Sequence, residues 1–128
     1  MSAQFLSGAE VAEAVLADVK TRVAGLADKG VTPGLGTILV GDDEASAGYV
    51  RKKHETCAQV GIASFNVEIP ARANQGDLLA AVRAFNDDPA VDAFLIQYPV
   101  PEHFDFSAAL EEMAPAKDAD GLHPASLG

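Results

Sequence analysis

The stretch 37–57 constrains the fold more than any other part of the sequence. The apolar run 35–40 ends at Gly41, a Gly-Asp-Asp turn follows, and a helix-forming segment begins at about Glu44. A short apolar run bounded by glycine is typical of a strand inside a parallel sheet, and the helix behind it has the length of a crossover. Open parallel sheets bind ligands at the carboxyl ends of their strands, so we expect the functional site at the first turns of this helix.

Two side chains on this helix are candidates for chemistry. Tyr49 and Lys53 lie one turn apart on the same face, so a phenol and an ammonium group can address one small molecule. The same spacing fits a solvated pair, because charged residues on helices usually lie at the surface. Lys52 follows Tyr49 by three residues and lies about as close to this face, so spacing alone does not choose between the two lysines.

Helical and strand patterns alternate along the chain. Ser7 and Glu10 match the capping box that begins a helix. The predicted helices cover 8–29, 44–60, 75–86 and 107–113, the predicted strands cover 35–40, 65–69 and 91–97, and a loop without apolar period follows. This order predicts an α/β fold, a three-layer sandwich with a mostly parallel sheet flanked by helices, formed by residues 1–128 as one domain.

The apolar pattern also predicts which parts of each element are buried. The first helix carries one apolar stripe, made of Val11, Val15, Leu16, Val19, Val23 and Leu26. Apolar and polar residues alternate along 65–69, which favours a half-covered strand near a sheet edge, whereas the run 93–96 favours a strand buried on both faces. We expect Asp42 or Asp43 to cap the second helix, and Gly30 and Gly61 to end the first two helices.

Composition narrows the possible partners. Nineteen acidic and nine basic residues give a net charge of −10, which repels phosphate backbones and anionic lipids, so we expect neither nucleic acid nor a membrane as partner. The N-terminal residues 1–8 lack a leader pattern, and no apolar run has the length of a membrane helix. A single cysteine, Cys57, fits a reducing compartment, so we expect a cytoplasmic protein.

Further candidates follow the last predicted strand. Gln97 ends that strand, which places an amide at the carboxyl edge of the sheet; a satisfied strand-end amide explains it equally well. Asp118 and Asp120 lie in a loop with Gly121, where turn chemistry is the simpler explanation. A carboxylate at this point is also able to accept two parallel hydrogen bonds from the amidine-like edge of a pterin or guanine ring.

Other sites receive less support. His54 and Cys57 are three residues apart on a helix, but nothing orients the histidine as in a nucleophilic pair, and Cys57 is better explained as core filler. His103 and His123 belong to no cluster with ligand spacing, so no metal site is predicted. The chain has neither a Walker loop nor a Rossmann fingerprint, so we predict no nucleotide cofactor site in these residues.

Three separated motifs carry a resemblance to a known family. They are Ser-Ala-Gly-Tyr-Val-Arg-Lys-Lys at 46–53, Phe-Leu-Ile-Gln-Tyr-Pro-Val-Pro at 94–101 and Lys-Asp-Ala-Asp-Gly-Leu-His-Pro at 117–124. In this order and spacing they resemble the bifunctional methylenetetrahydrofolate dehydrogenase/cyclohydrolase family. The resemblance extends from Ser7 to Gly128, and it implies the α/β fold that the alternating pattern predicts independently.

The resemblance also implies roles for individual residues. It assigns the helix lysine to Lys53 and not Lys52, with Tyr49 beside it and Gln97 at the strand end as the remaining catalytic group. The residues that it implies for substrate binding are Asp120, Tyr49, Ser46, Pro99 and Val100. A lysine hydrogen-bonded to the glutamine is suited to guide or deprotonate the water that attacks a methenyl carbon.

The implied reactions belong to one-carbon folate metabolism and purine biosynthesis. They are the oxidation of 5,10-methylenetetrahydrofolate with NADP or NAD, and the hydrolysis of the methenyl product to 10-formyltetrahydrofolate. The resemblance implies a homodimeric parent enzyme with a nicotinamide-binding Rossmann domain after residue 128, which the 128 residues do not include. They correspond either to an excised domain or to a natural short form.

Two positions depart from the family pattern. Tyr98 stands where the family usually has leucine, which affects the wall of the pocket, and Ala9 stands where it usually has lysine. Two further hypotheses therefore stay open beside the folate enzyme. One is a folate-binding module without turnover, and the other is half of a related two-domain dehydrogenase that acts on a different small metabolite.

Overall fold

The computed structural model of the protein describes residues 7–127. In chain order its elements are α1 (Gly8–Ala27), β1 (Gly34–Val40), α2 (Glu44–Val60), β2 (Ala63–Ile69), α3 (Gln75–Asp87), β3 (Ala93–Ile96), α4 (Phe106–Glu112), the 3₁₀ helix η1 (Pro115–Lys117) and α5 (Pro124–Leu127). Residues 1–6 lie outside this description, and they include most of the N-terminal segment 1–8 in which the sequence shows no leader pattern. Within residues 7–127, no helix is both long and apolar enough to cross a membrane.

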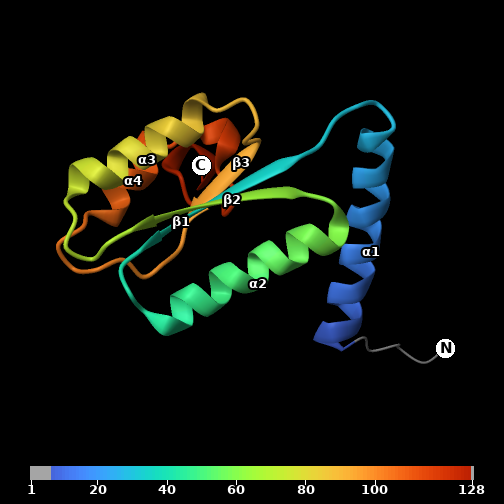
Figure 1. Ribbon diagram of the computed structural model, residues 1–128, viewed down its shortest axis with the longest axis horizontal. Helices are drawn as coiled ribbons and strands as arrows, with labels where there is room; N and C mark the ends of the chain where they lie inside the picture. Colours follow the sequence, from blue (N-terminus) through green and yellow to red (C-terminus); the bar gives the residue numbers. More distant parts are fainter. Residues whose placement is uncertain (1–6, 128) are drawn as a thin grey trace.

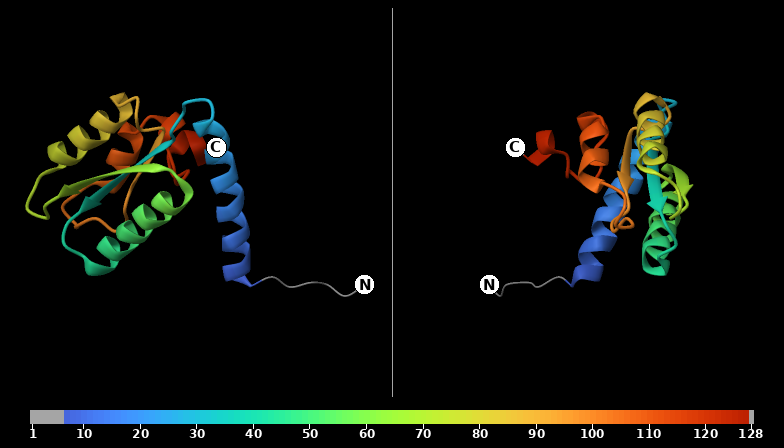
Figure 2. Two further views of the ribbon diagram at one scale, coloured as in Figure 1. Left: turned by 45° about the vertical axis from the view of Figure 1, so that its right-hand side comes forward. Right: turned by 90° about the vertical axis from the view of Figure 1, so that its left-hand side faces the viewer.

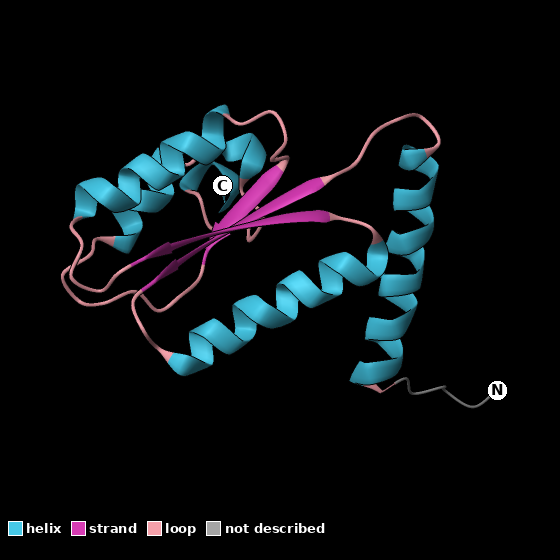
Figure 3. Ribbon diagram, in the orientation of Figure 1, coloured by secondary structure: helices cyan, strands magenta, loops and turns pink. Residues whose placement is uncertain are grey.

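The three strands form one parallel sheet in the order β2-β1-β3. Helices α3 and α4 lie on one side of it and α2 on the other (Figure 1), and the same layers are visible when elements are coloured by type (Figure 3). The predicted α/β fold with a parallel sheet flanked by helices is therefore confirmed. Strand β2 lies at an edge, as its alternating pattern predicted, and β1 is central.

The main core lies between the sheet and α3 with α4. Its members are buried apolar side chains that point from alternate strand positions and from the inner faces of the helices. They include Ile38, Val40, Phe94, Ile96, Leu78, Val82, Phe85, Ala109 and Met113. This packing holds β3 against β1, which fixes the position of the strand end that carries Gln97.

The predicted element boundaries need small corrections. Strand β3 covers four residues, fewer than the predicted run 91–97, because Val91 still belongs to the turn after α3, where its N–H bonds the Asp88 carbonyl. The predicted loop after residue 114 contains η1 and α5, which are too short to show an apolar period. Asp43 is the cap of α2, and Gly61 ends it with a positive φ of 88°.

Helix α1 is less covered than its apolar stripe predicted. Val23 is buried, but Val11 and Val15 are 45% and 56% exposed. The N-terminal half of α1 extends away from the sheet and from α2 (Figures 1 and 2). The periodicity therefore identified the apolar side of the helix, but part of this apolar stripe is exposed to solvent.

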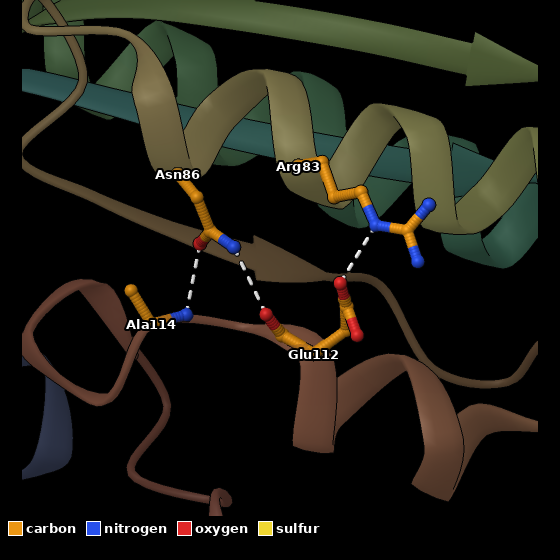
Figure 4. Close-up of polar contacts among 4 residues, drawn as sticks. All are labelled: Arg83, Asn86, Glu112 and Ala114. Carbon is orange, nitrogen blue, oxygen red and sulfur yellow. Dashed lines mark hydrogen bonds and ion pairs between the residues drawn. The ribbon is translucent and has the colours of Figure 1, made fainter.

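Polar contacts fix the chain after α4 to α3 (Figure 4). The Asn86 amide donates to the Glu112 carbonyl at 2.9 Å and accepts from the Ala114 N–H at 2.8 Å, and Arg83 Nε lies 2.7 Å from Glu112 Oε1. Lys117 Nζ then donates to the Phe85 and Asp88 carbonyls, each at 2.9 Å, at the C-terminal end of α3. The loop that follows η1, with Asp118 and Asp120, is therefore anchored at its start.

Gly36 is a position where the core leaves no room for a side chain. A Cβ atom there would lie 2.9 Å from the Phe85 ring and 3.0 Å from Phe94 Cβ. We expect Gly36→Ala to lower the free energy of unfolding by about 1–3 kcal/mol, because overpacking strains a dense core. Urea denaturation measures this change.

The matched control for this prediction is Gly25→Ala in α1. A Cβ atom at Gly25 meets nothing within 4 Å, so alanine should raise the free energy of unfolding by about 0.5–1 kcal/mol through helix propensity. Equal effects of the two substitutions would contradict the steric argument for Gly36.

Candidate functional site

Lys53 and Gln97 meet at the carboxyl edge of the sheet. Lys53 Nζ donates a hydrogen bond of 2.8 Å to Gln97 Oε1, although 44 residues separate them. Gln97 is fixed there because its N–H extends the β3 ladder to the Ile38 carbonyl, and its side-chain amide donates to the Tyr98 carbonyl. The neighbouring Lys52 is exposed, so the roll of α2 over the sheet directs Lys53, and not Lys52, toward Gln97.

The N-terminus of α2 is built by Asp43 and Ser46. The Asp43 carboxylate accepts from the Ser46 N–H at 2.8 Å and from its hydroxyl at 2.9 Å. These two bonds, the backbone one first, hold the pKa of Asp43 below its ordinary value. Ser46 is 1% exposed, so its hydroxyl serves the helix cap in this structure, and its substrate-binding role stays a prediction.

Tyr49 lies one turn before Lys53 on the open side of α2. Its side chain is 59% exposed, which is unusual for a large aromatic group with no partner to cover it. Lys53 is half-buried below it. The structure therefore brings the ammonium group and the Gln97 amide together, while a role of the exposed Tyr49 phenol beside them stays a prediction.

The two loop carboxylates have different surroundings. Asp118 accepts from the N–H groups of Gly121 at 3.0 Å and His123 at 2.8 Å. Desolvation opposes ionisation of Asp118, but these and other hydrogen bonds from the following loop outweigh it, so its pKa is lowered. A single bridge between Phe94 and Asp118 places this loop along the free edge of β3. For Asp118 the turn interpretation therefore holds.

Asp120 is exposed and faces a hollow of about 320 Å³. The hollow is lined by Leu35, Lys52, Lys53, Thr56, Cys57, Leu95, Ala119 and Asp120. Desolvation raises the pKa of the Asp120 carboxyl; the positive charge of Lys53 opposes this shift and the negative charge of Asp118 adds to it. The carboxylate thus shares one concave surface with Lys53, and the two strand leucines give that surface an apolar floor.

Pro99 and Val100 line a separate, smaller hollow. It has a volume of about 180 Å³ and lies between the β1–α2 turn and the segment after β3, with walls from Gly41, Asp42 and Asp43. Tyr98, which precedes it, is 65% exposed, and its ring meets the Phe106 ring edge-on with centroids 5.2 Å apart. The Tyr98–Pro99 peptide bond is cis.

A more voluminous hollow lies elsewhere. It measures about 830 Å³, is formed by the β1–α2 turn, α2 and β2, and carries Asp42, Glu44, Arg51 and Glu68. None of the residues predicted for the site lines it. We place the candidate site at Lys53, Gln97 and Asp120, because Lys53 borders the same apolar hollow as Asp120 and bonds Gln97, so three separated segments of the chain meet there.

His54 and Cys57 do not form a nucleophilic pair. Both ring nitrogens of His54 are engaged elsewhere, Nε2 with Thr37 Oγ1 at 2.8 Å and Nδ1 with Ser64 Oγ at 2.6 Å. Cys57 is buried, and burial raises the pKa of its thiol, which disfavours the reactive thiolate. The sequence interpretation missed the His54 contacts; the single threonine inside the apolar run 35–40 was the available signal.

The remaining histidines serve the backbone. His103 Nε2 lies 3.1 Å from the Ala73 carbonyl, and His123 Nδ1 accepts from the Ala125 N–H at 3.0 Å. Across residues 7–127, no three His, Cys, Asp or Glu residues are grouped so that they could hold a metal ion.

Comparisons with known proteins agree on one family. The family model described as the catalytic domain of tetrahydrofolate dehydrogenase/cyclohydrolase matches residues 6–120. The bifunctional protein FolD of Syntrophotalea carbinolica is 69% identical over 128 residues, which are 100% of this chain and 44% of that relative. The chain therefore spans less than half the length of this relative.

Solved structures show the same similarity. A methylenetetrahydrofolate dehydrogenase-cyclohydrolase of Trypanosoma brucei, solved with NADP and an inhibitor, superposes with a TM-score of 0.90 at 38% identity, over 98% of this chain and 43% of that one. A 5,10-methylenetetrahydrofolate dehydrogenase of the silkworm Bombyx mori gives 0.92 at 33% identity, over 99% and 44%.

Proposed function

Because this chain belongs to the tetrahydrofolate dehydrogenase/cyclohydrolase family, we propose that it provides the folate site for the interconversion of one-carbon folates. The single observation that carries the proposal is the 2.8 Å hydrogen bond between Lys53 Nζ and Gln97 Oε1, beside the free carboxylate of Asp120. A charged donor, an amide and a carboxylate on one apolar floor suit a ligand with a polar heterocycle and a reactive carbon.

Hydrolysis of the methenyl form is the step that these residues are able to support directly. The methenyl carbon is electrophilic, and water must reach it while losing a proton. Gln97 Oε1 accepts one hydrogen of Lys53 Nζ and so fixes the position of the nitrogen. The remaining positions on Nζ hold the water, and in its deprotonated form the amine takes one proton of the water as the C–O bond forms. The C–N bond of the resulting hydroxyl adduct then breaks as the hydroxyl proton passes to the released nitrogen, which leaves the formyl group.

Asp120 is proposed to bind the pterin end of the folate. The amino-pyrimidinone edge offers two neighbouring N–H donors, which match the two oxygens of a carboxylate. Leu35 and Leu95 supply the apolar surface under the ring, and Tyr49 stands on the open side where it can cover the ligand. Ser46, Pro99 and Val100 are proposed to shape the remaining wall.

The described residues do not fit a nicotinamide cofactor. A dinucleotide site needs a glycine-rich turn whose helix N-terminus receives the pyrophosphate. The β1–α2 turn has one glycine followed by two carboxylates, and Asp43 already occupies the helix N-terminus. We therefore propose that oxidation of the methylene form needs NADP or NAD held outside residues 7–127, by residues such as those that the longer relatives have beyond the matched part. Homodimer formation, the cytoplasmic location and the link to purine biosynthesis stay predictions.

Hydrolysis of methenyltetrahydrofolate by the 128-residue chain tests the proposal. Loss of the methenyl absorbance at a rate proportional to protein concentration, above the uncatalysed rate, would support it. Folate binding without such a rate would favour the alternative function, a folate-binding module without turnover. The feature that favours this alternative is the exposed Tyr98. Absence of folate binding would contradict the proposal and favour a different small metabolite.

We expect no reduction of NADP or NAD by the 128-residue chain alone. Hydride transfer requires the nicotinamide within a few ångströms of the methylene carbon, and such positioning supplies about 7–11 kcal/mol of the barrier. The measurement is absorbance at the reduced nicotinamide band with methylenetetrahydrofolate. The full-length relative from Syntrophotalea carbinolica serves as positive control, and a rising trace from the 128-residue chain would reveal a cofactor site in it.

A further inference from the structure

A partly buried polar network joins α2 to β1 and β2. Thr37 in β1 is fully buried, and His54 of α2 contacts it through Nε2 at 2.8 Å. The other ring nitrogen, Nδ1, contacts Ser64 Oγ of β2 at 2.6 Å. Thr37 Oγ1 also donates to Asn66 Oδ1 of β2 at 2.9 Å. One imidazole is thus held by two neighbouring strands.

The Thr37 hydroxyl is shared within this network. It donates to Asn66 Oδ1 at 2.9 Å, and the Phe65 carbonyl lies 3.5 Å from the same oxygen. With Thr37 Oγ1 as donor to Asn66, its oxygen accepts from an Nε2–H of His54, and Nδ1 pairs with the Ser64 hydroxyl. Contacts at both ring nitrogens restrain the orientation of the ring and of the helix that carries it.

The network and the candidate site hold α2 from opposite sides. Lys53 and His54 are consecutive, so their side chains leave the helix about 100° apart. Lys53 reaches Gln97 after β3, whereas His54 reaches Ser64 of β2, and these two strands lie on either side of the central strand β1. Two neighbouring residues, each hydrogen-bonded to a different part of the sheet, therefore restrain the rotation of α2 about its own axis.

We propose that His54 is a positioning residue for Lys53. This inference rests on the proposed function, because it concerns the same hydrolysis. A side-chain tip lies about 6 Å from a helix axis, so a rotation of about 10° moves Lys53 Nζ by about 1 Å. A displacement of about 1 Å at a reacting group is able to cost about 10²-fold in rate.

The bond to Gln97 alone does not secure the position of Lys53. A lysine side chain is long and flexible, and a bond to one amide oxygen tolerates many helix rotations. The imidazole is short and stiff, and its two bonds are made to groups on β1 and β2, whose ladder pairs Leu35 with Ser64 and Thr37 with Asn66. Of these two residues, His54 therefore restrains the rotation of α2 more tightly than Lys53 does.

Kinetics of the 128-residue chain with a His54→Leu substitution test the proposal. Leucine removes both bonds, so we expect kcat for methenyltetrahydrofolate hydrolysis to fall by about ten- to a hundredfold with KM nearly unchanged. His54→Gln keeps an N–H donor at the reach of Nε2 and should recover most of the loss. A crystal structure of His54→Leu should show α2 rotated about its axis and Lys53 Nζ displaced by about 1 Å.

Val60→Ala separates positioning from stability. Val60 is a buried residue at the far end of α2, so its truncation weakens the packing of the same helix without touching the network. We expect a lower free energy of unfolding and an unchanged kcat per folded molecule. Equal loss of kcat in Val60→Ala and His54→Leu would overturn the proposal, and so would an unmoved Lys53 Nζ in the His54→Leu crystal structure. If the unsubstituted chain shows no hydrolysis, the proposed function fails, while the crystal structure still decides the role of His54.

Discussion

Lys53→Met is expected to abolish hydrolysis of methenyltetrahydrofolate while folate binding survives. Methionine keeps most of the length of lysine but removes the charge and the donors that reach Gln97. Loss of a group that moves a proton in the transition state costs about 10²–10⁴-fold in rate. The measurement is the turnover rate at saturating folate, together with a binding titration of the variant.

Lys52→Met is the control that the chain itself offers. Lys52 is the preceding residue on the same helix, borders the same hollow and is exposed. We expect a small change in KM and little change in kcat, because its nitrogen is not fixed beside Gln97. Equal loss of turnover from both substitutions would contradict the specific role of Lys53 and indicate a general effect of positive charge.

Asp120→Asn is expected to weaken folate binding by roughly ten- to a hundredfold. A carboxylate hydrogen-bonded to the amino-pyrimidinone edge contributes on the order of 1.5–3 kcal/mol, and asparagine replaces one acceptor with a donor. A calorimetric titration measures the affinity. Glu55→Gln, which removes an exposed carboxylate from α2, controls for the loss of one negative charge.

The same carboxylate predicts the pH dependence of binding. Only ionised Asp120 accepts two hydrogen bonds, so its contribution is present above its pKa and is lost as the pH falls through it. Because desolvation raises this pKa, the loss should begin at a higher pH than for an ordinary aspartate. If Asp120→Asn binds folate with unchanged affinity at every pH, the carboxylate has no role in binding, and a structural role in the turn explains it.

Periodicity in the sequence predicted the elements well because each element has its own local pattern. The bounds of α2 were predicted without error, and the cap and the terminating Gly61 follow from residues directly beside it. Burial of α1 was predicted less well. A stripe of valines identifies the side of a helix that avoids water, but it contains no information about what covers that side, and Val11 and Val15 are exposed in the structure.

The part of the candidate site that depends on where strands end and helices begin was predictable from the sequence. Spacing left Lys52 and Lys53 equivalent, because the choice depends on how α2 rolls over the sheet. The contact of His54 with Ser64 was not predictable, because it depends on the register between β1 and β2. The contact of Ser46 was not predicted either. Its hydroxyl donates to Asp43, three residues earlier, whereas the family resemblance implies that it binds the substrate.

The long separation between Lys53 and Gln97 has a consequence for the synthesis of the protein. The hydrogen bond joins residues 44 positions apart, and it requires α2, β2, α3 and β3 to be in place. A contact of this sequence separation forms only after the strands around it have paired. Under the proposed function, a nascent chain on the ribosome therefore has no complete folate site until β3 has joined β1.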